Sequence, residues 1–337
     1  MIHKENNYSL KSLNTFGIDA KTKHYIAFDQ MDDIFEVDKL LSELTDKQRL
    51  VLGGGSNILF TKDFEGVVVQ SKIDFIQKIS ETEERVVVEV GSGMVWDDFV
   101  SYCVNNNWGG TENLSAIPGV IGAAPVQNIG AYGVEAKDVI RSVKYWDFAK
   151  KQVVEIDNES CHFGYRDSIF KNELKGKTIV LSVLFDLSKK DHKLNLSYGA
   201  LKDLNESDVD LRTIREKVVE IRDSKLPDPV KIGNGGSFFK NPILEKDFTD
   251  QLLQEFPEMV TYKVSDTKVK VAAGWLIEQA GWKGYSENHV GVHDKQSLVL
   301  VNHGGAKGEE IVSLSQKIIN DIYDKFKITL HPEVIFI

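Results

Sequence analysis

The 337-residue sequence contains few of the residues that build disulfide-stapled or membrane-embedded proteins. Cysteine occurs only as Cys103 and Cys161, which excludes a disulfide framework and a zinc site built from cysteine thiolates. No apolar run approaches the roughly 20 residues that a membrane-spanning helix needs. The first residues lack the apolar centre of a signal peptide, so we expect a cytoplasmic protein.

The chain also lacks a surplus of positive charge. Its Lys and Arg residues number 41 and its Asp and Glu residues 51, so the net charge is −10. This balance argues against general nucleic-acid binding, which needs a basic stripe. An anionic small ligand is still compatible, because a few cations can reverse the field inside a cleft. The length predicts two or three domains, and the 42% hydrophobic content excludes disorder over most of the chain.

Several motifs of nucleotide-dependent and metal-dependent enzymes are absent. The chain has no G-x-x-x-x-G-K-[ST] phosphate loop, no G-x-G-x-x-G fingerprint, no H-E-x-x-H and no G-x-S-x-G. A Rossmann dehydrogenase, a P-loop enzyme and an α/β-hydrolase therefore all lose support. We also expect no metal site.

Apolar periodicity and β-branched runs predict alternating strands and helices. Asp29 is the expected N-cap of the first helix, and residues 225–229 (Lys-Leu-Pro-Asp-Pro) should end another helix at a domain boundary. Strands are expected at residues 24–28, 49–52, 67–69, 86–90, 143–146, 179–185 and 333–337. Helices are expected at residues 31–44, 96–103, 210–222, 272–280 and 309–326.

Three glycines, Gly53, Gly54 and Gly55, follow the second of these strands and precede Ser56 and Asn57. Consecutive glycines expose backbone N–H groups without obstruction by Cβ atoms, which suits a phosphate or pyrophosphate. The alternative is a tight turn between strands. A turn rarely needs three glycines with Ser and Asn, so the pattern favours anion binding.

A second glycine-rich stretch covers residues 109–133, where apolar residues alternate with glycine and proline. This pattern is typical of backbone pressed against backbone or against a ligand, and it is not typical of a flexible linker. Gln127 and Asn128 add amide donors and acceptors. The residues leave two interpretations open: a wall around a flat ligand, or a packing layer of small residues.

Three further side chains could carry chemistry, although the residues alone favour plainer roles. Arg166 could hold a carboxylate in a bidentate fashion, or could pair with Asp167 at the surface. Ser237 follows two glycines and could donate a proton, but serine is more often a helix cap. Glu333 reads by default as a surface residue of an edge strand.

Eight segments in sequence order resemble the UDP-N-acetylenolpyruvoylglucosamine reductases, also called UDP-N-acetylmuramate dehydrogenases, of bacterial wall synthesis. They span nearly the whole chain, and their combination is specific although no single segment is decisive. Residues 196–201 resemble the tyrosine-bearing loop of the longer type I subtype. The eight segments are residues 14–17, 53–57, 117–133, 164–170, 225–229, 233–242, 272–278 and 331–334.

The resemblance implies an α+β protein with a two-lobed FAD-binding domain of the vanillyl-alcohol-oxidase (PCMH) type and a C-terminal α+β substrate-binding domain. The expected boundaries are residues 1–72 and 73–226 for the two FAD lobes and 227–337 for the substrate domain, whose last strand could return to the FAD lobes. It implies non-covalent FAD, NADPH as co-substrate, and reduction of UDP-N-acetyl-enolpyruvoylglucosamine to UDP-N-acetylmuramate. Neither nucleic acid nor membrane is an implied partner, and a monomer is compatible.

The resemblance also assigns roles to individual positions. Arg166 and Glu333 match the pair at the substrate carboxylate, where Glu333 would have to be protonated or act through water. Ser237 matches the proton donor. Residues matching FAD contacts are Gly53, Gly54, Gly55, Ser56, Asn57, Pro118, Gly119, Gly122, Ala123 and Tyr132, the last of which could touch either ligand. Residues matching substrate contacts are Tyr198, Lys225, Asn241, Lys270 and Gln296.

Two other function classes remain to be weighed. A flavin oxidase of the same superfamily often attaches FAD through His or Cys, but no His lies in the two glycine-rich segments and Cys103 lies on a helix face. A non-catalytic flavin or sugar-nucleotide binder would not need Arg166, Ser237 and Glu333 together. One departure from the family is Ile335, where many relatives carry a basic residue.

Overall fold

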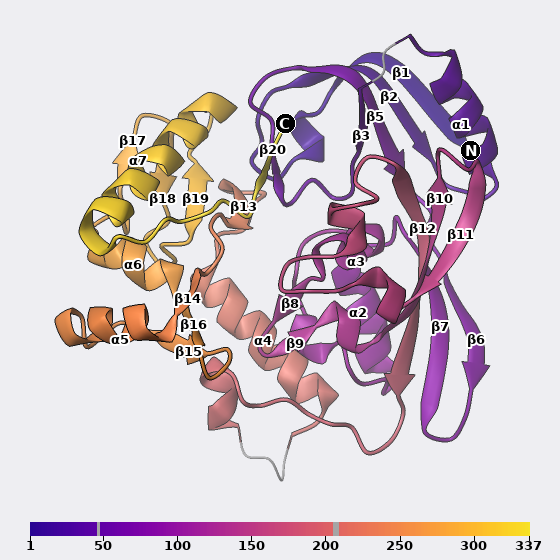
Figure 1. Ribbon diagram of the computed structural model, residues 1–337. Coiled ribbons are helices and arrows are strands. Elements are labelled where there is room, and N and C mark those ends of the chain that lie inside the picture. The colour runs from indigo at the N-terminus through magenta and orange to yellow at the C-terminus, as the bar shows by residue number, and fades with distance from the viewer. Residues whose placement is uncertain (46–47, 205–208) are drawn as a thin grey trace. The chain divides into compact units, whose positions relative to one another are not determined.

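The computed structural model describes residues 1–45, 48–204 and 209–337 and divides the chain into two compact units (Figure 1). Unit 1 consists of Met1–Tyr8, Thr22–Gly54 and Glu65–Ser224. Unit 2 consists of Ser9–Lys21, Gly55–Phe64 and Lys225–Ile337, so two short N-terminal stretches belong with the C-terminal third. The three-domain division implied by the resemblance stays a prediction.

Unit 1 contains two larger sheets, with strand orders β1-β2-β5-β3 and β11-β10-β12-β7-β6. Its strands are β1 Ile2–Ser9, β2 Lys21–Phe28, β3 Arg49–Val51, β5 Phe64–Ser71, β6 Ile76–Glu81, β7 Arg85–Gly91, β8 Gly130–Ala131, β9 Val134–Glu135, β10 Ile140–Asp147, β11 Gln152–Asp157 and β12 Thr178–Ser188. Its helices are α1 Asp33–Glu43, α2 Trp96–Asn105, α3 Ala124–Gln127 and α4 Leu211–Lys225.

The five-stranded sheet of unit 1 has a hydrophobic core on each face. Strand β12 shows why, because successive side chains of a strand point to opposite faces. Ile179 and Leu181 pack with residues of α1, β2 and β5, whereas Val180, which lies between them, packs with residues of α2. The nearly continuous apolar run of β12 is therefore the sequence signature of a strand buried on both sides.

Helix α4 forms because its apolar residues recur at helical spacing. Leu211, Ile214, Val218 and Ile221 are its buried residues. Asp210 precedes the helix, and its Oδ1 accepts the backbone N–H of Thr213 at 2.7 Å, as an N-cap does. The helix ends at Lys225, where the predicted Lys-Leu-Pro-Asp-Pro stop begins, and the boundary between the units falls between Ser224 and Lys225.

Unit 2 contains a four-stranded sheet, a three-stranded sheet and the short parallel pair of β4 and β20. Strand orders are β13-β19-β18-β17 and β14-β16-β15. Its strands are β4 Ile58–Leu59, β13 Gly233–Ser237, β14 Ile243–Glu245, β15 Thr261–Lys263, β16 Lys268–Val271, β17 Ser286–Glu287, β18 Val290–Val292, β19 Val299–Asn302 and β20 Ile335–Phe336. Its helices are α5 Lys246–Glu255, α6 Ala273–Gln279 and α7 Gly308–Phe326.

Most predicted elements are confirmed, and two details are wrong. Asp29 is not an N-cap, because α1 begins at Asp33 after a turn in which the Asp33 N–H donates to the Gln30 carbonyl at 3.2 Å. The Asp29 carboxylate instead accepts a hydrogen bond from the amino group of Met1. The last strand is also shorter than expected, because only Ile335–Phe336 pairs with β4.

The first residue of α7, Gly308, packs directly on another backbone segment of unit 2. A Cβ atom at this position would lie 1.9 Å from the carbonyl oxygen of Phe60. Because a backbone oxygen cannot move aside cheaply, we expect Gly308→Ala to lower the free energy of unfolding by about 1–3 kcal/mol.

Urea unfolding measures this effect, and Gly274→Ala is the matched control. The nearest atom to a Cβ at Gly274, in α6, lies 3.4 Å away, so the helical preference of alanine should leave stability unchanged or raised by up to about 1 kcal/mol. Equal midpoints for the two variants would contradict the packing argument.

Candidate functional site

The two glycine-rich segments meet backbone to backbone within unit 1. A Cβ atom at Gly54 would lie 2.9 Å from the Cα atom of Gly119, and one at Gly53 would lie 3.3 Å from the side chains of Val120 and Ala123. A Cβ at Gly122 would lie 2.8 Å from the Cβ of Ser92. Both segments therefore need glycine for close approach.

Backbone donors remain available in the first segment. Within residues 1–45, 48–204 and 209–337, the hydrogen bonds of the chain occupy none of the N–H groups of Gly53, Gly54 and Gly55. The continuation of the segment in unit 2 is anchored elsewhere, since the Gly55 carbonyl accepts the Thr15 N–H at 3.1 Å. Consecutive unoccupied N–H groups fit the pyrophosphate predicted from the sequence better than they fit a plain turn.

The second segment contains a residue held in a strained conformation. Ala116 has φ 56°, a left-handed value that disfavours a residue with a Cβ. The N–H of Ala116 donates to Asp97 Oδ1 at 2.5 Å, and its carbonyl accepts from Arg222 Nε at 3.1 Å. These bonds fix the peptide that leads into residues 117–123.

Asp97 is itself fixed by α4. Arg215 donates to both Asp97 oxygens, at 2.7 and 2.9 Å. Burial alone would raise the pKa of Asp97, but the hydrogen bonds from Arg215 and Ala116 outweigh it and the pKa is lowered. Burial lowers the pKa of Arg222, and its contact with Tyr132 offsets part of that shift.

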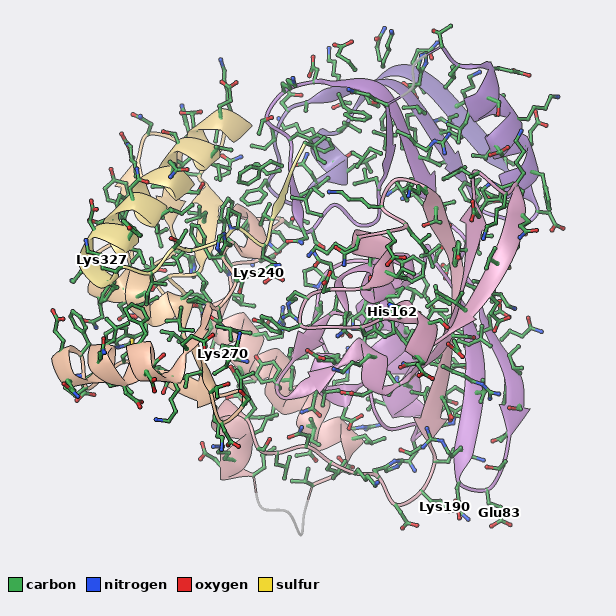
Figure 2. All side chains as sticks on the ribbon, viewed as in Figure 1. Glu83, His162, Lys190, Lys240, Lys270 and Lys327 are labelled. Atoms are coloured by element: carbon green, nitrogen blue, oxygen red, sulfur yellow. The ribbon has the colours of Figure 1, made fainter. Side chains whose placement is uncertain are left out.

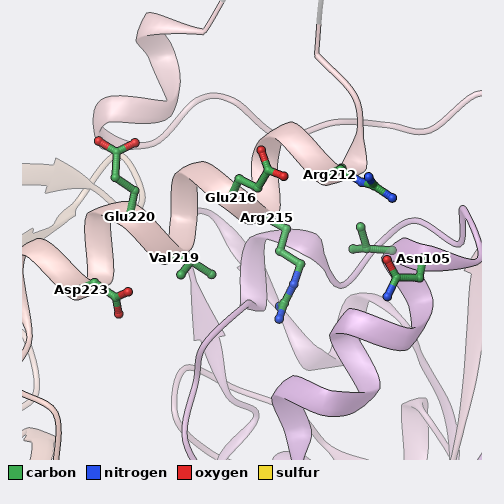
Figure 3. Close-up of a pocket in the computed structure, with 8 residues that line it drawn as sticks. Asn105, Arg212, Arg215, Glu216, Val219, Glu220 and Asp223 are labelled. Carbon is green, nitrogen blue, oxygen red and sulfur yellow. The ribbon is translucent and has the colours of Figure 1, made fainter.

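A hollow of about 530 Å³ lies where α4 faces the end of α2, and Arg215 points across it (Figure 3). No predicted site residue lines it. Its lining residues are Val104, Asn105, Arg212, Arg215, Glu216, Val219, Glu220 and Asp223.

Asn113 connects the second segment to the loop that carries Tyr198. It is fully buried, and its Nδ2 donates to the carbonyls of Tyr132 at 3.0 Å and Asn195 at 2.8 Å. The rings of Tyr132 and Tyr198 then meet edge to face with centroids 6.0 Å apart. Tyr132 has φ 49°, and burial raises its pKa.

Arg166 lies in a turn of unit 1 beside the same segment. Its φ is 54°, and its Nη2 donates to the Gly130 carbonyl at 2.7 Å. The turn is closed by reciprocal backbone hydrogen bonds between Gly164 and Asp167. Arg166 is thus brought to the segment that holds Pro118, Gly119, Gly122 and Ala123 within one unit.

Ser237 and Glu333 come together in unit 2. Ser237 ends β13 opposite Val299, and no helix starts there, so the reading of Ser237 as a helix cap is wrong. The Glu333 N–H donates to the carbonyl of Phe238, the next residue after Ser237, at 2.7 Å. Asn57 Nδ2 donates to the Glu333 carbonyl at 3.2 Å, so the first glycine-rich segment ends beside Glu333.

Three of the predicted substrate residues gather around the start of α6 in unit 2. Asn241 Oδ1 accepts the Ala273 N–H at 2.9 Å. Lys270 lies on β16, the central strand of its sheet, between Ile243 and Tyr262 (Figure 2). Gln296 Oε1 lies 3.4 Å from the position of a Cβ on Gly274. Tyr198 belongs to unit 1 instead, and Lys225 is an exposed residue at the end of α4.

Comparison with known proteins assigns this arrangement to a family. Residues 23–157 match a model described as FAD binding domain, and residues 228–337 match the UDP-N-acetylenolpyruvoylglucosamine reductase C-terminal domain. A UDP-N-acetylenolpyruvoylglucosamine reductase of Flavobacterium johnsoniae is 46% identical over 98% of both chains. One from Bacteroides fragilis is 45% identical over 99% of this chain and 100% of its own.

The chain belongs to the UDP-N-acetylenolpyruvoylglucosamine reductase family. A solved reductase of this family from Thermus caldophilus has the same fold, with a TM-score of 0.68, 19% identity and coverage of 100% of this chain and 98% of that one. The α+β fold with an FAD-binding domain, which the sequence predicted, is thereby confirmed. Across the described ranges, no helix combines the length and apolarity needed to cross a membrane.

The residues present fit the FAD that this family uses. The close approach of Gly54 to Gly119 leaves no room for a side chain at Gly54, and the free N–H groups suit a pyrophosphate. Both cysteines are buried. Burial raises the pKa of Cys103, and it raises the pKa of Cys161 to about 12. Neither thiol is therefore suited to covalent attachment of a flavin.

Sequence reasoning missed the residues that hold the site in place. Asp97, Arg215 and Arg222 act on Ala116 from distant helices, and a single sequence carries no signal for such long-range hydrogen bonds. Lys171 could have been noticed, because it directly follows residues 164–170 and adds a second cation five residues after Arg166.

We expect Gly54→Ala to weaken FAD binding by at least about tenfold, because the added Cβ would push Gly119 away. Fluorescence titration of the apoprotein with FAD measures this change. Gly164→Ala is the control in the same unit, since its Cβ would find its nearest atom at 3.5 Å. Tight FAD binding by Gly54→Ala would show that the two segments tolerate separation.

We expect the free energy of unfolding to depend on pH through Glu112. Burial raises the pKa of this carboxyl group, and backbone hydrogen bonds oppose that shift only in part. Between the unfolded and the raised folded pKa, the folded state keeps a proton that the unfolded state releases, so the free energy of unfolding falls as pH rises. Glu112→Gln removes this loss and can still accept the Gly110 N–H, which Glu112 accepts at 2.6 Å.

Urea unfolding at several pH values, from about 4 upward, measures the difference between Glu112→Gln and the natural protein. The variant should gain relative stability as pH increases. Glu83→Gln, at a carboxylate that is 90% exposed, is the control and should leave the free energy of unfolding nearly unchanged. A pH-independent difference for Glu112→Gln argues against this account.

Proposed function

We propose that the protein catalyses the NADPH-dependent, FAD-mediated reduction of UDP-N-acetyl-enolpyruvoylglucosamine to UDP-N-acetylmuramate. The observation that carries this proposal is the full-length match to reductases of that name, at 46% identity over 98% of both chains. The presence of Arg166, Ser237 and Glu333 supports a catalyst over a binding module.

The substrate carboxylate is the group at which the protein must stabilise charge. FAD held by residues 53–57 and 118–123 would supply the hydride, drawn from NADPH, for the methylene carbon of the enolpyruvyl group. Negative charge then develops on the substrate carboxylate. A fixed guanidinium stabilises charge that grows during the reaction, and Arg166 is the group proposed for this role.

Ser237 is proposed to give its proton to the carbon that bears the ether oxygen. Serine is a weak acid, but a carboxylate-stabilised carbanion is a strong base, so placement decides whether the transfer is competent. The bond from the Glu333 N–H to the Phe238 carbonyl supports a shared site, because it holds Glu333 one residue from Ser237. Glu333, protonated or through water, would assist at the carboxylate.

The sugar nucleotide is assigned to the predicted substrate residues. Lys270 and Lys225 would face the diphosphate or carboxylate, since both groups are anionic. Asn241 and Gln296 offer amide groups near Lys270, and Tyr198 adds a phenol from the loop held by Asn113. Ile335, on β20, pairs with Ile58 and brings no cation to this strand, in contrast to many relatives.

The cytoplasm is the proposed compartment, because sugar nucleotides and NADPH are available there and the two cysteines are unpaired thiols. A monomer is sufficient for this function in the proposal, since all assigned residues come from one chain.

Anaerobic mixing tests the function. The protein should be yellow, NADPH should bleach its flavin, and the enolpyruvyl sugar nucleotide should restore the colour. In Ser237→Ala we expect bleaching by NADPH to stay fast while recolouring slows about 100-fold or more, because the proton donor is lost. A colourless protein that does not bind added FAD would contradict the proposed function. Recolouring at the natural rate in Ser237→Ala would contradict the role of Ser237 as proton donor.

A further inference from the structure

Arg166 holds a conformation that its own residue type disfavours. Its φ of 54° lies in the left-handed region, where a Cβ crowds the following carbonyl. Such a conformation persists only where surrounding contacts enforce it. The reciprocal hydrogen bonds of Gly164 and Asp167 define the turn, but they do not contact the Arg166 carbonyl.

The Arg166 carbonyl is held by Lys171. Lys171 ends the short 3₁₀ helix Ile169–Lys171, and its Nζ donates to the Arg166 carbonyl at 2.9 Å. The same ammonium donates to Gln127 Oε1 at 2.9 Å. Lys171 thus connects the turn that carries Arg166 to the end of α3.

Two neighbouring hydrogen bonds join the same two segments, the turn that carries Arg166 and the end of α3. Ser168 Oγ donates to the Val126 carbonyl at 2.9 Å, and Asn128 Nδ2 donates to the Gly164 carbonyl at 2.8 Å. These bonds hold the turn against residues 126–128 at both of its ends. Lys171 is the contact in the middle, and it reaches the residue whose side chain is assigned to the substrate.

We propose that Lys171 is a positioning residue for Arg166: its ammonium fixes the left-handed Arg166 backbone against Gln127 and thereby aims the guanidinium. This inference rests on the proposed function of Arg166. It goes beyond that function because it assigns the placement of Arg166 to a specific second cation.

The first test is structural and does not depend on activity. In a crystal structure of FAD-loaded Lys171→Met, Arg166 should leave φ near 54° and its Nη2 should leave the Gly130 carbonyl. Lys171→Arg should retain both features, because a guanidinium can donate to the same two acceptors. An unchanged Arg166 in Lys171→Met would overturn the proposal.

The second test is kinetic. Protein reduced with dithionite is mixed anaerobically with the enolpyruvyl sugar nucleotide, and flavin reoxidation is followed. Lys171→Met should reoxidise about 10- to 100-fold more slowly at saturating substrate, the usual effect of a misplaced group. FAD content and thermal midpoint should stay near those of the natural protein. Lys171→Arg should recover most of the rate.

Lys175→Met is the matched control, because it removes an exposed lysine from the same segment without touching the Arg166 carbonyl. Its reoxidation should stay within about threefold of the natural rate. Reoxidation of Lys171→Met at the natural rate, or an equal loss in Lys175→Met, would overturn the proposal.

A double variant separates positioning from general damage. If Lys171 acts through Arg166, adding Lys171→Met to Arg166→Ala should slow reoxidation no further than Arg166→Ala alone. Additive losses would overturn the proposal. If the natural reduced protein is not reoxidised by the sugar nucleotide, the proposed function fails, and the crystal structure still decides whether Lys171 positions Arg166.

Discussion

The approach of two glycine backbones, Gly54 against Gly119, is the constraint on which the FAD-binding unit depends. A single methyl group at Gly54 would lie 2.9 Å from the opposite Cα atom. The end of β3 and the start of the short helix Ile121–Ala123 are therefore held at a separation that no other residue allows. The hydrogen bonds around Ala116 then determine how the second segment enters this contact.

The cationic side chains of unit 1 are also held by nearby backbone groups. The chain carries a net charge of −10, yet Arg166, Lys171 and Arg222 each donate to the second glycine-rich segment. Backbone carbonyls accept hydrogen bonds from each of them, at Gly130, Arg166 and Ala116 respectively. An acidic protein can thus present a local positive field to an anionic substrate without becoming a general polyanion binder.

The sequence predicted the helices and strands whose formation depends mainly on the pattern of neighbouring residues. The apolar spacing of α4 and the β-branched run of β12 correspond to observed elements, and the glycine clusters indicated close backbone contact. The error at Asp29 arose because a turn precedes α1 and the Met1 amino group takes the carboxylate. Left-handed Ala116, Tyr132 and Arg166 could not be predicted, because none is glycine and the carbonyl of each accepts a hydrogen bond from a side chain elsewhere in the chain.

The stretches Ser9–Lys21 and Gly55–Phe64 belong to the same unit as Lys225–Ile337, and this has a consequence for how the chain is made. Ribosomes release the N-terminal stretches long before Ile337, whose carbonyl accepts the Thr61 N–H at 2.8 Å, has been synthesised. Those early stretches must wait for the partners that Lys225–Ile337 supplies until that part of the chain has been synthesised. Closing such long loops is entropically slow, so unit 2 should be the last part of the nascent protein to mature.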